Sequence, residues 1–283
     1  MKKVGFVDYY LSEWHANNYP KWIAQANEAL GTDYVLTYVW ALEDVSPVDG
    51  RTTDQWCEAF GARRCQSAQE LCEKSDVIFI LAPSNPEKHL ELAQLVFPCG
   101  KPVYMDKPFA DTKENAREIF ALAEKYSTPF FSSSALRYAT ELDSVETCQA
   151  ITTLGAGSNL PEYIIHQVEM VVKKMGTGAT AIKAQRIGDS QCVFTIRYPD
   201  DRAAGMHFVR GGAPFTAVMS PADGAPVVHQ AISSPFFALL IQDILRFFER
   251  GVSSFDSKET LEVNKIMVAA IQAQDQPDQW LTL

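Results

Sequence analysis

The first half of the chain alternates short apolar runs with stretches of helical periodicity. The expected strands are residues 3–7, 34–40, 63–65, 76–81, 102–105 and 129–132, and the expected helices are residues 14–30, 53–60, 68–73, 86–96 and 111–126. The clearest signal is the run DVIFIL at residues 76–81, which is typical of a strand buried on both faces. Strands and helices that alternate at this spacing predict βαβ units and a parallel sheet covered on both faces.

The second half has a different pattern. Its expected strands are residues 179–187, 191–198, 203–210, 215–219 and 227–232, and its expected helices are residues 161–174, 235–250 and 257–273. Consecutive strands joined by short turns predict a largely antiparallel sheet. The fold class is therefore α/β, with an N-terminal Rossmann-like, doubly wound parallel sheet (residues 1–134) and a C-terminal α+β domain with a largely antiparallel open sheet (residues 135–283).

Composition and charge narrow the function classes. The formal net charge of -10 disfavours nucleic acid as the main partner, because a phosphate backbone needs a basic surface. The six cysteines form no CxxC pair, so neither a metal site nor a disulfide framework is expected. No apolar run is long enough for a signal peptide or a membrane span, and we expect a cytoplasmic protein.

Candidate chemistry falls at the carboxyl ends of the expected parallel strands, where open sheets of this kind bind ligands. The first such end, Asp8–Tyr10, is the position of the glycine-rich turn of dinucleotide-binding proteins. Asp8, Tyr10 and Glu13 stand there instead of glycines, and Asp8 and Glu13 place negative charge where a pyrophosphate is expected. The second such end is residues 82–85.

Lys107 follows the strand at residues 102–105 and precedes Pro108, which favours an extended conformation for the lysine. A lysine in this position can donate a proton or hold a substrate hydroxyl or carbonyl oxygen. The alternative interpretation is an ordinary solvated lysine in a turn.

His166 shares one face of the expected helix with Glu162 and Glu169, at spacings of four and three residues. A carboxylate one turn away can orient an imidazole for general acid/base work. A surface histidine within a helical charge cluster is the alternative, and a metal site is disfavoured because no fourth ligand is in view. The other histidines, at positions 15, 89, 207 and 229, are expected to be structural.

In combination, several segments resemble the glucose–fructose oxidoreductase/inositol dehydrogenase (Gfo/Idh/MocA) family. They are SDVIFILAPSN at residues 75–85, His89, GKPVYMDKPF at residues 100–109, Arg137-Tyr138, residues 162–169 and DSKETL at residues 256–261. The resemblance covers most of the chain in the right order. It implies NAD or NADP as cofactor, oxidation of a hydroxyl on a sugar, cyclitol or related small molecule, and a second domain that binds substrate and forms a homodimer or homotetramer.

The resemblance also implies roles for individual residues. The catalytic set is Lys107, His166 and Glu162, and the substrate side is formed by Lys107, Arg137, Tyr138 and His166. The cofactor side is formed by Asp8, Tyr9, Tyr10, Pro83, Ser84, Asn85, Asp106 and Lys107. Asp106 and Glu162 depart from the family pattern, which has Glu and Asp there, but both keep the charge.

Two other functions stay open at this point. One is a catalytically silent sugar- or protein-binding regulator, motivated by the absent glycine fingerprint. The other is a non-redox enzyme that uses Lys107 and His166. The aromatic residues Tyr9, Tyr10, Trp14 and Tyr19 are expected to pack beneath the second domain, with stacking on adenine or on a sugar face as alternatives.

Overall fold

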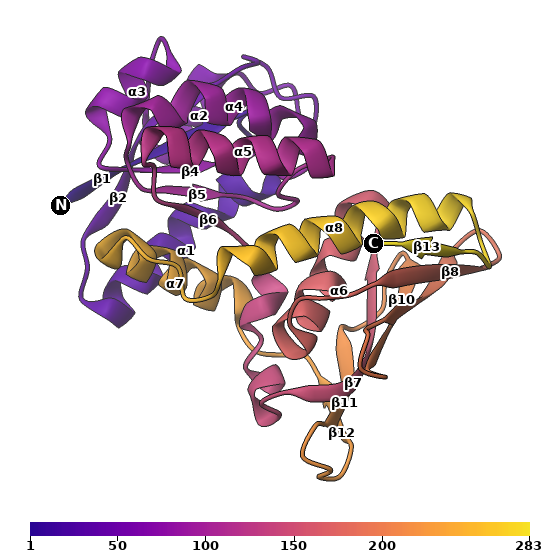
Figure 1. Ribbon diagram of the computed structural model, residues 1–283. Coiled ribbons are helices and arrows are strands. Elements are labelled where there is room, and N and C mark those ends of the chain that lie inside the picture. Colours follow the sequence, from indigo (N-terminus) through magenta and orange to yellow (C-terminus); the bar gives the residue numbers. More distant parts are fainter. The chain divides into compact units, whose positions relative to one another are not determined.

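The structure, a computed structural model, describes residues 1–283 and divides into two compact units (Figure 1). The first unit comprises Met1–Ser133 and Phe237–Phe255. The second comprises Ser134–Phe236 and Asp256–Leu283. Each unit is built around its own sheet.

The first unit contains a six-stranded parallel sheet with the strand order β3-β2-β1-β4-β5-β6. Its strands are β1 (Lys2–Asp8), β2 (Tyr34–Ala41), β3 (Arg63–Arg64), β4 (Val77–Ile80), β5 (Val103–Met105) and β6 (Phe130–Ser132). The order reverses direction between β1 and β4, and this switch point is where doubly wound sheets form a ligand crevice. The predicted fold class is confirmed for this unit.

Helices cover both faces of this sheet (Figure 1). They are α1 (Trp14–Leu30), α2 (Thr53–Phe60), α3 (Ala68–Lys74), α4 (His89–Val96), α5 (Lys113–Tyr126) and α7 (Phe236–Arg250), with short 3-10 helices at η1 (Pro86–Lys88) and η2 (Phe97–Cys99). Side chains of Ser, Thr or Glu cap the starts of α1, α2, α3 and α5, and left-handed glycines end α1 and α2. The helix predicted over residues 86–96 is divided into η1 and α4.

Helix α7 joins the first unit although it follows the second-unit strands in sequence. The ring of Phe248 in α7 contacts Tyr34 and Phe79 of the sheet, and the ring of Phe247 contacts Phe131. Burying this apolar face against residues of β2, β4 and β6 stabilises the helix on the sheet. The structure therefore differs from the predicted division at residues 134/135, which assigned the whole C-terminal half to the second domain.

The second unit contains a seven-stranded sheet with the order β12-β11-β7-β10-β9-β8-β13, in which only the β7–β10 pair is parallel. Its strands are β7 (Cys148–Gly157), β8 (Ala181–Ile187), β9 (Gln191–Arg197), β10 (Ala203–Arg210), β11 (Thr216–Pro221), β12 (Val228–Ala231) and β13 (Trp280–Thr282). Its helices are α6 (Leu160–Met175) and α8 (Ser257–Asp275), with 3-10 helices at η3 (Ala135–Tyr138) and η4 (Thr140–Ser144). The mostly antiparallel sheet confirms the predicted class of this half.

The sequence pattern did not predict β7 or β13. Strand β7 reads CQAITTLGAG, in which small and polar residues hide the apolar alternation. Its two glycines permit close packing, because a Cβ at Gly155 would meet the Phe215 ring and one at Gly157 would meet Tyr163. The strand is nevertheless central in its sheet.

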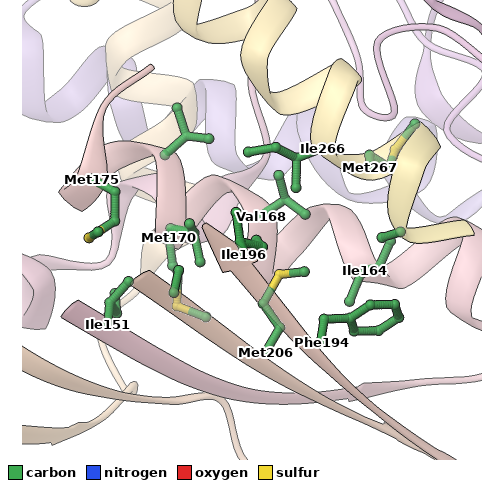
Figure 2. Packing of buried hydrophobic residues seen from close by; sticks show 14 of the residues in the cluster. Ile151, Ile164, Val168, Met170, Met175, Phe194, Ile196, Met206, Ile266 and Met267 are labelled. Atoms are coloured by element: carbon green, nitrogen blue, oxygen red, sulfur yellow. The ribbon is translucent and has the colours of Figure 1, made fainter. Parts of the chain in front are cut away.

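The core of the second unit lies between this sheet and helices α6 and α8 (Figure 2). Figure 2 shows Ile164, Val168 and Met170 of α6 next to Met206 of the sheet and Ile266 of α8. All five side chains are fully buried. Because α6 is buried along nearly its whole length, His166 sits on a rigid element.

A substitution at Gly5 tests the packing that holds the first strand. A Cβ at Gly5 would come within 2.6 Å of Leu71 Cδ2 in α3 and closer still to Ser75 Oγ. We expect Gly5→Ala to lower the free energy of unfolding by ~1–3 kcal/mol, because a buried strand and helix must move apart. Urea denaturation measures this loss.

Gly212→Ala is the matched control, since a Cβ there meets nothing within 4 Å and the backbone conformation is not left-handed. An equal effect of the two substitutions would contradict the packing explanation.

Candidate active site

The parallel ladder of the first unit aligns three strand ends at one edge of the sheet. Leu81 N donates to Val7 O (2.8 Å) across β4 and β1, and Asp106 N donates to Ile80 O (2.8 Å) across β5 and β4. The residues that follow β1, β4 and β5 are therefore neighbours. They include Asp8, Pro83 and Lys107, which were all predicted to belong to the site.

Asp106 is the centre of a buried hydrogen-bond cluster at this edge. Its carboxylate pairs with His15 Nδ1 and accepts from the hydroxyl groups of Tyr19 (3.2 Å) and Tyr104 (3.3 Å). Burial raises the pKa of Asp106, but His15 and then the Lys107 ammonium outweigh it, so the pKa lies below its usual value. Asp106 is therefore a fixed negative charge.

Lys107 lies directly beside that charge and is only 6% exposed. Its backbone N donates to Asp106 Oδ1 (2.8 Å), which fixes the start of the Lys107-Pro108 turn. The structure thus does not support the interpretation of Lys107 as a solvated turn lysine. A buried ammonium at a strand end is suited to holding an oxygen that gains negative charge.

His89 connects the β4 end to the segment after Lys107. Its two ring nitrogens lie 2.5 Å from Leu81 O and 2.9 Å from Phe109 O, and the side chain is completely buried. Burial lowers the pKa of His89. The prediction of a structural role agrees with this position, which holds two strand ends in place.

The turn between β1 and α1 carries two more buried carboxylates. Asp8 Oδ1 accepts from the backbone N of Tyr9 (2.7 Å) and of Ala82 (2.9 Å), whereas Asp8 Oδ2 has no hydrogen-bond partner. Glu13 caps α1, accepting from the backbone N of His15 (2.7 Å) and of Ala16. Burial, and then the mutual charge of the pair, raises the pKa of Asp8 well above its usual value, and burial raises that of Glu13.

The remaining predicted cofactor residues of this unit differ in exposure. Tyr10 and Pro83 are buried, Ser84 is exposed, and Tyr9 and Asn85 are intermediate. Asn85 Nδ2 donates to Glu87 (2.9 Å), and the ammonium of Lys88 lies 5.2 Å from the Tyr9 ring centroid.

The aromatic residues of α1 pack within the first unit. Trp14 lies 4.9 Å from Phe237 of α7 between ring centroids, and Phe237 stacks on Trp22 at 4.8 Å. Tyr19 contacts Phe79 of β4 and the Asp106 carboxylate. These contacts join α1 to α7 within the first unit, and packing of Trp14 and Tyr19 beneath the second domain stays a prediction.

In the second unit, His166 is held by a network that begins at the end of β6. Its Nδ1 lies 2.6 Å from Ser134 Oγ. The backbone N of Ser134 donates to Glu169 (2.8 Å), one turn after the histidine on α6. Glu169 also pairs with Arg137 (3.3 Å), which in turn pairs with Glu259 at the start of α8.

The network adds Glu169 to the surroundings of His166. The buried carboxylate of the cluster is Glu169, whereas Glu162 is partly exposed and exchanges hydrogen bonds with Asn159, the cap residue of α6. The sequence pattern placed Glu169 on the right face, but no local signal singled out Ser134. Arg137, 7% exposed, is engaged by two carboxylates, and its neighbour Tyr138 is partly exposed.

The β1–α1 turn can be tested directly as a pyrophosphate site. Such a site needs unpaired backbone amides at the helix start and a close approach of the backbone. At this turn the amides of His15 and Ala16 are bound by Glu13, and Tyr10 fills the position of the second fingerprint glycine. In this conformation the residues of the turn do not fit a pyrophosphate.

The strand order of the first unit defines a Rossmann-type sheet. The sequence model of the Gfo/Idh/MocA family, described as an oxidoreductase family with an NAD-binding Rossmann fold, matches residues 24–133. The match agrees with the resemblance seen in the sequence: residues 24–133 are similar to the Gfo/Idh/MocA oxidoreductase family. The match begins after the β1–α1 turn, where the sequence departs from the glycine fingerprint.

Solved structures share the fold along the whole chain. A probable dehydrogenase from Thermotoga maritima superposes with a TM-score of 0.78 at 10% identity, covering 99% of this chain and 98% of that one. Scyllo-inositol dehydrogenase from Lactobacillus casei, solved with bound NAD(H) and scyllo-inositol, gives 0.75 at 13% identity, with coverage of 100% and 99%. UDP-N-acetylglucosamine 3-dehydrogenase from Acidithiobacillus ferrooxidans gives 0.76 at 12% identity, with 98% of each chain covered.

Sequence comparison with curated proteins finds no match. None of the helices combines the length and the apolar character that crossing a membrane requires. No group of three or more His, Cys, Asp or Glu side chains is arranged to hold a metal ion.

The unpartnered oxygen of Asp8 leads to a pH-dependent prediction. Asp8→Asn keeps an acceptor for the Tyr9 and Ala82 amides and removes the buried charge. The folded chain holds the Asp8 proton more tightly than the unfolded chain, whose aspartate pKa is about 4. The free energy of unfolding of the wild type therefore falls as the pH rises above about 4, whereas at lower pH Asp8 is protonated in both states and causes no loss.

We expect Asp8→Asn to raise the free energy of unfolding by ~1–3 kcal/mol at pH 8. This gain should shrink as the pH falls toward 4. Urea denaturation across this pH range measures it, with exposed Asp189→Asn as the neutral control. A gain that is the same at all pH values would show that the buried charge is not its cause.

Proposed function

We propose that this protein is an NAD(P)-dependent oxidoreductase that acts on a CH–OH group, or on the corresponding carbonyl, of a sugar, cyclitol or related small molecule. The observation that carries the proposal is the buried Lys107 at the carboxyl end of β5, in a sheet of the NAD-binding oxidoreductase family. Similarity to that family favours neither a silent regulator nor a non-redox enzyme.

In this proposal Lys107 stabilises the substrate oxygen while it carries negative charge. The Asp106 carboxylate beside it accepts a hydrogen bond from the Lys107 backbone N and fixes the backbone there. An ammonium held in place before the reaction needs no reorganisation when charge develops, and this is the property that lowers a barrier.

His166 accepts the hydroxyl proton in the oxidative direction and returns it in the reductive direction. Because its Nδ1 faces Ser134, we assign proton exchange with the substrate to Nε2. Ser134, Glu169 and Arg137 are positioning residues that hold the ring. Glu162, one turn before the histidine on α6, is proposed as the third member of the catalytic set.

The rest of the assignment follows the family pattern. Tyr138 and Arg137 are proposed on the substrate side, while the Pro83–Asn85 segment and Tyr9 are proposed on the cofactor side. The face of the second sheet turned away from α6 and α8 carries the exposed Val218 and the half-buried His207. We propose that this face joins copies of the chain in a dimer or tetramer.

Titration of the purified protein with NADH and NADPH, followed by cofactor fluorescence, tests the proposal. We expect one of the two to bind and to be oxidised or reduced in the presence of a cyclitol or sugar from a substrate panel. Failure of both cofactors to bind at millimolar concentration would reject it.

Lys107→Ala separates a catalytic role from simple cofactor binding. If Lys107 stabilises the reacting oxygen, kcat should fall by ~100- to 1,000-fold while the Kd for the cofactor changes by less than about threefold. Steady-state kinetics and fluorescence titration give the two numbers.

The matched control is Lys125→Ala, which removes an exposed lysine from α5. Equal losses in kcat and in cofactor affinity would show that Lys107 is a cofactor clamp.

A further inference from the structure

Four backbone amides near the carboxyl ends of the parallel strands already donate hydrogen bonds to carboxylates of the chain itself. Asp8 takes two of them and Glu13 takes the other two. They are the amides of Tyr9, Ala82, His15 and Ala16. Two of these amides form the start of α1, the place where a dinucleotide-binding turn presents its amides to phosphate.

A helix start attracts an anion for two reasons. Its first amides have no partner within the helix, and the aligned peptide dipoles leave a partial positive charge there. In α1 both demands are met by Glu13, whose side chain folds back onto His15 N and Ala16 N and is only 6% exposed. The carboxylate has the charge and the acceptor oxygens of a phosphate, in the position of a phosphate.

Glu13 is not an ordinary cap residue. Short side chains are preferred at this position, and the other capped helices of the chain follow that preference. Their caps are Thr52, Ser67, Thr112, Asn159 and Asp256. Glu13 also occupies the third position of the fingerprint spacing, whose first and second positions hold Asp8 and Tyr10.

We propose that the Glu13 carboxylate is a built-in substitute for the cofactor pyrophosphate, so that a dinucleotide binds this turn only when Glu13 leaves the start of α1. This inference rests on the proposed function, since it takes NAD(H) or NADP(H) as the ligand. It goes further by naming the residue that limits cofactor affinity. Asp8 adds to the barrier, because its buried, unpartnered oxygen places a second acceptor beside the turn.

Glu13→Gly tests the proposal most directly. It restores the fingerprint residue, frees both amides and leaves a residue that is tolerated at a helix cap. We expect the Kd for NADH and for ADP to fall by about tenfold or more, equivalent to about 1.4 kcal/mol. Adenosine, which has no phosphate, should bind equally to the wild type and the variant. Isothermal titration calorimetry of the full chain measures all three ligands.

Two further variants guard against misfolding and nonspecific charge effects. Glu13→Gln keeps the length of the cap side chain and removes its charge, so its Kd for ADP should lie between that of the wild type and that of Glu13→Gly. Asp256→Gly removes a carboxylate cap from α8 in the second unit and should leave ADP binding unchanged. Circular dichroism and the melting temperature check that each variant is folded.

The outcomes separate this inference from the proposed function. Wild type that fails to bind NADH or NADPH, together with Glu13→Gly that binds, would support the inference and reject the nicotinamide-dependent activity of this chain. Wild type that binds NADH as tightly as a folded Glu13→Gly variant would reject the inference and keep the function. Equal gains in affinity for ADP and for adenosine would also reject the inference, because added space rather than phosphate recognition would then explain the gains. If neither the wild type nor any variant binds a nucleotide, both the inference and the proposed function are rejected.

Discussion

The buried carboxylate of Asp106 is the interaction on which the first unit's site depends. It binds side chains of α1, namely His15 and Tyr19, and the backbone N of Lys107 after β5. A buried charge is costly unless it is paired, and removing one partner of such a pair typically costs ~3–5 kcal/mol. The first helix and the Lys107 turn are therefore held to each other by electrostatic necessity. The candidate catalytic lysine takes its position from this pairing.

The two other carboxylates at the same edge behave differently, and the cause is their surroundings. Asp106 has a histidine and a lysine nearby, and its pKa is lowered. Burial and then the charge of Glu13 raise the pKa of Asp8, and burial raises the pKa of Glu13. Asp106 is thus a permanent structural charge. Asp8 and Glu13 are the groups whose charge can change when an anionic ligand or a proton arrives.

In the second unit, the network around His166 fixes the orientation of its imidazole on α6, a helix that is almost entirely buried. The chain places Ser134 at the start of the unit, and its hydroxyl meets His166 while its backbone N meets Glu169. Arg137 neutralises Glu169 and links it to α8 through Glu259. The histidine is held by residues from η3, α6 and α8, so its orientation depends on the packing of the whole unit.

The sequence by itself determined the parallel sheet, because DVIFIL and the other apolar runs specify buried strands, and it placed Lys107 at a strand end. It did not reveal β7, whose small and polar residues become a central strand only against Phe215 and Tyr163. The tertiary structure alone decided that α7 joins the first unit and that Ser134 holds His166. The tertiary structure also decided that the Glu13 side chain caps the start of α1. These three features could not be predicted, because burial and long-range hydrogen bonds produce no periodic pattern in a sequence.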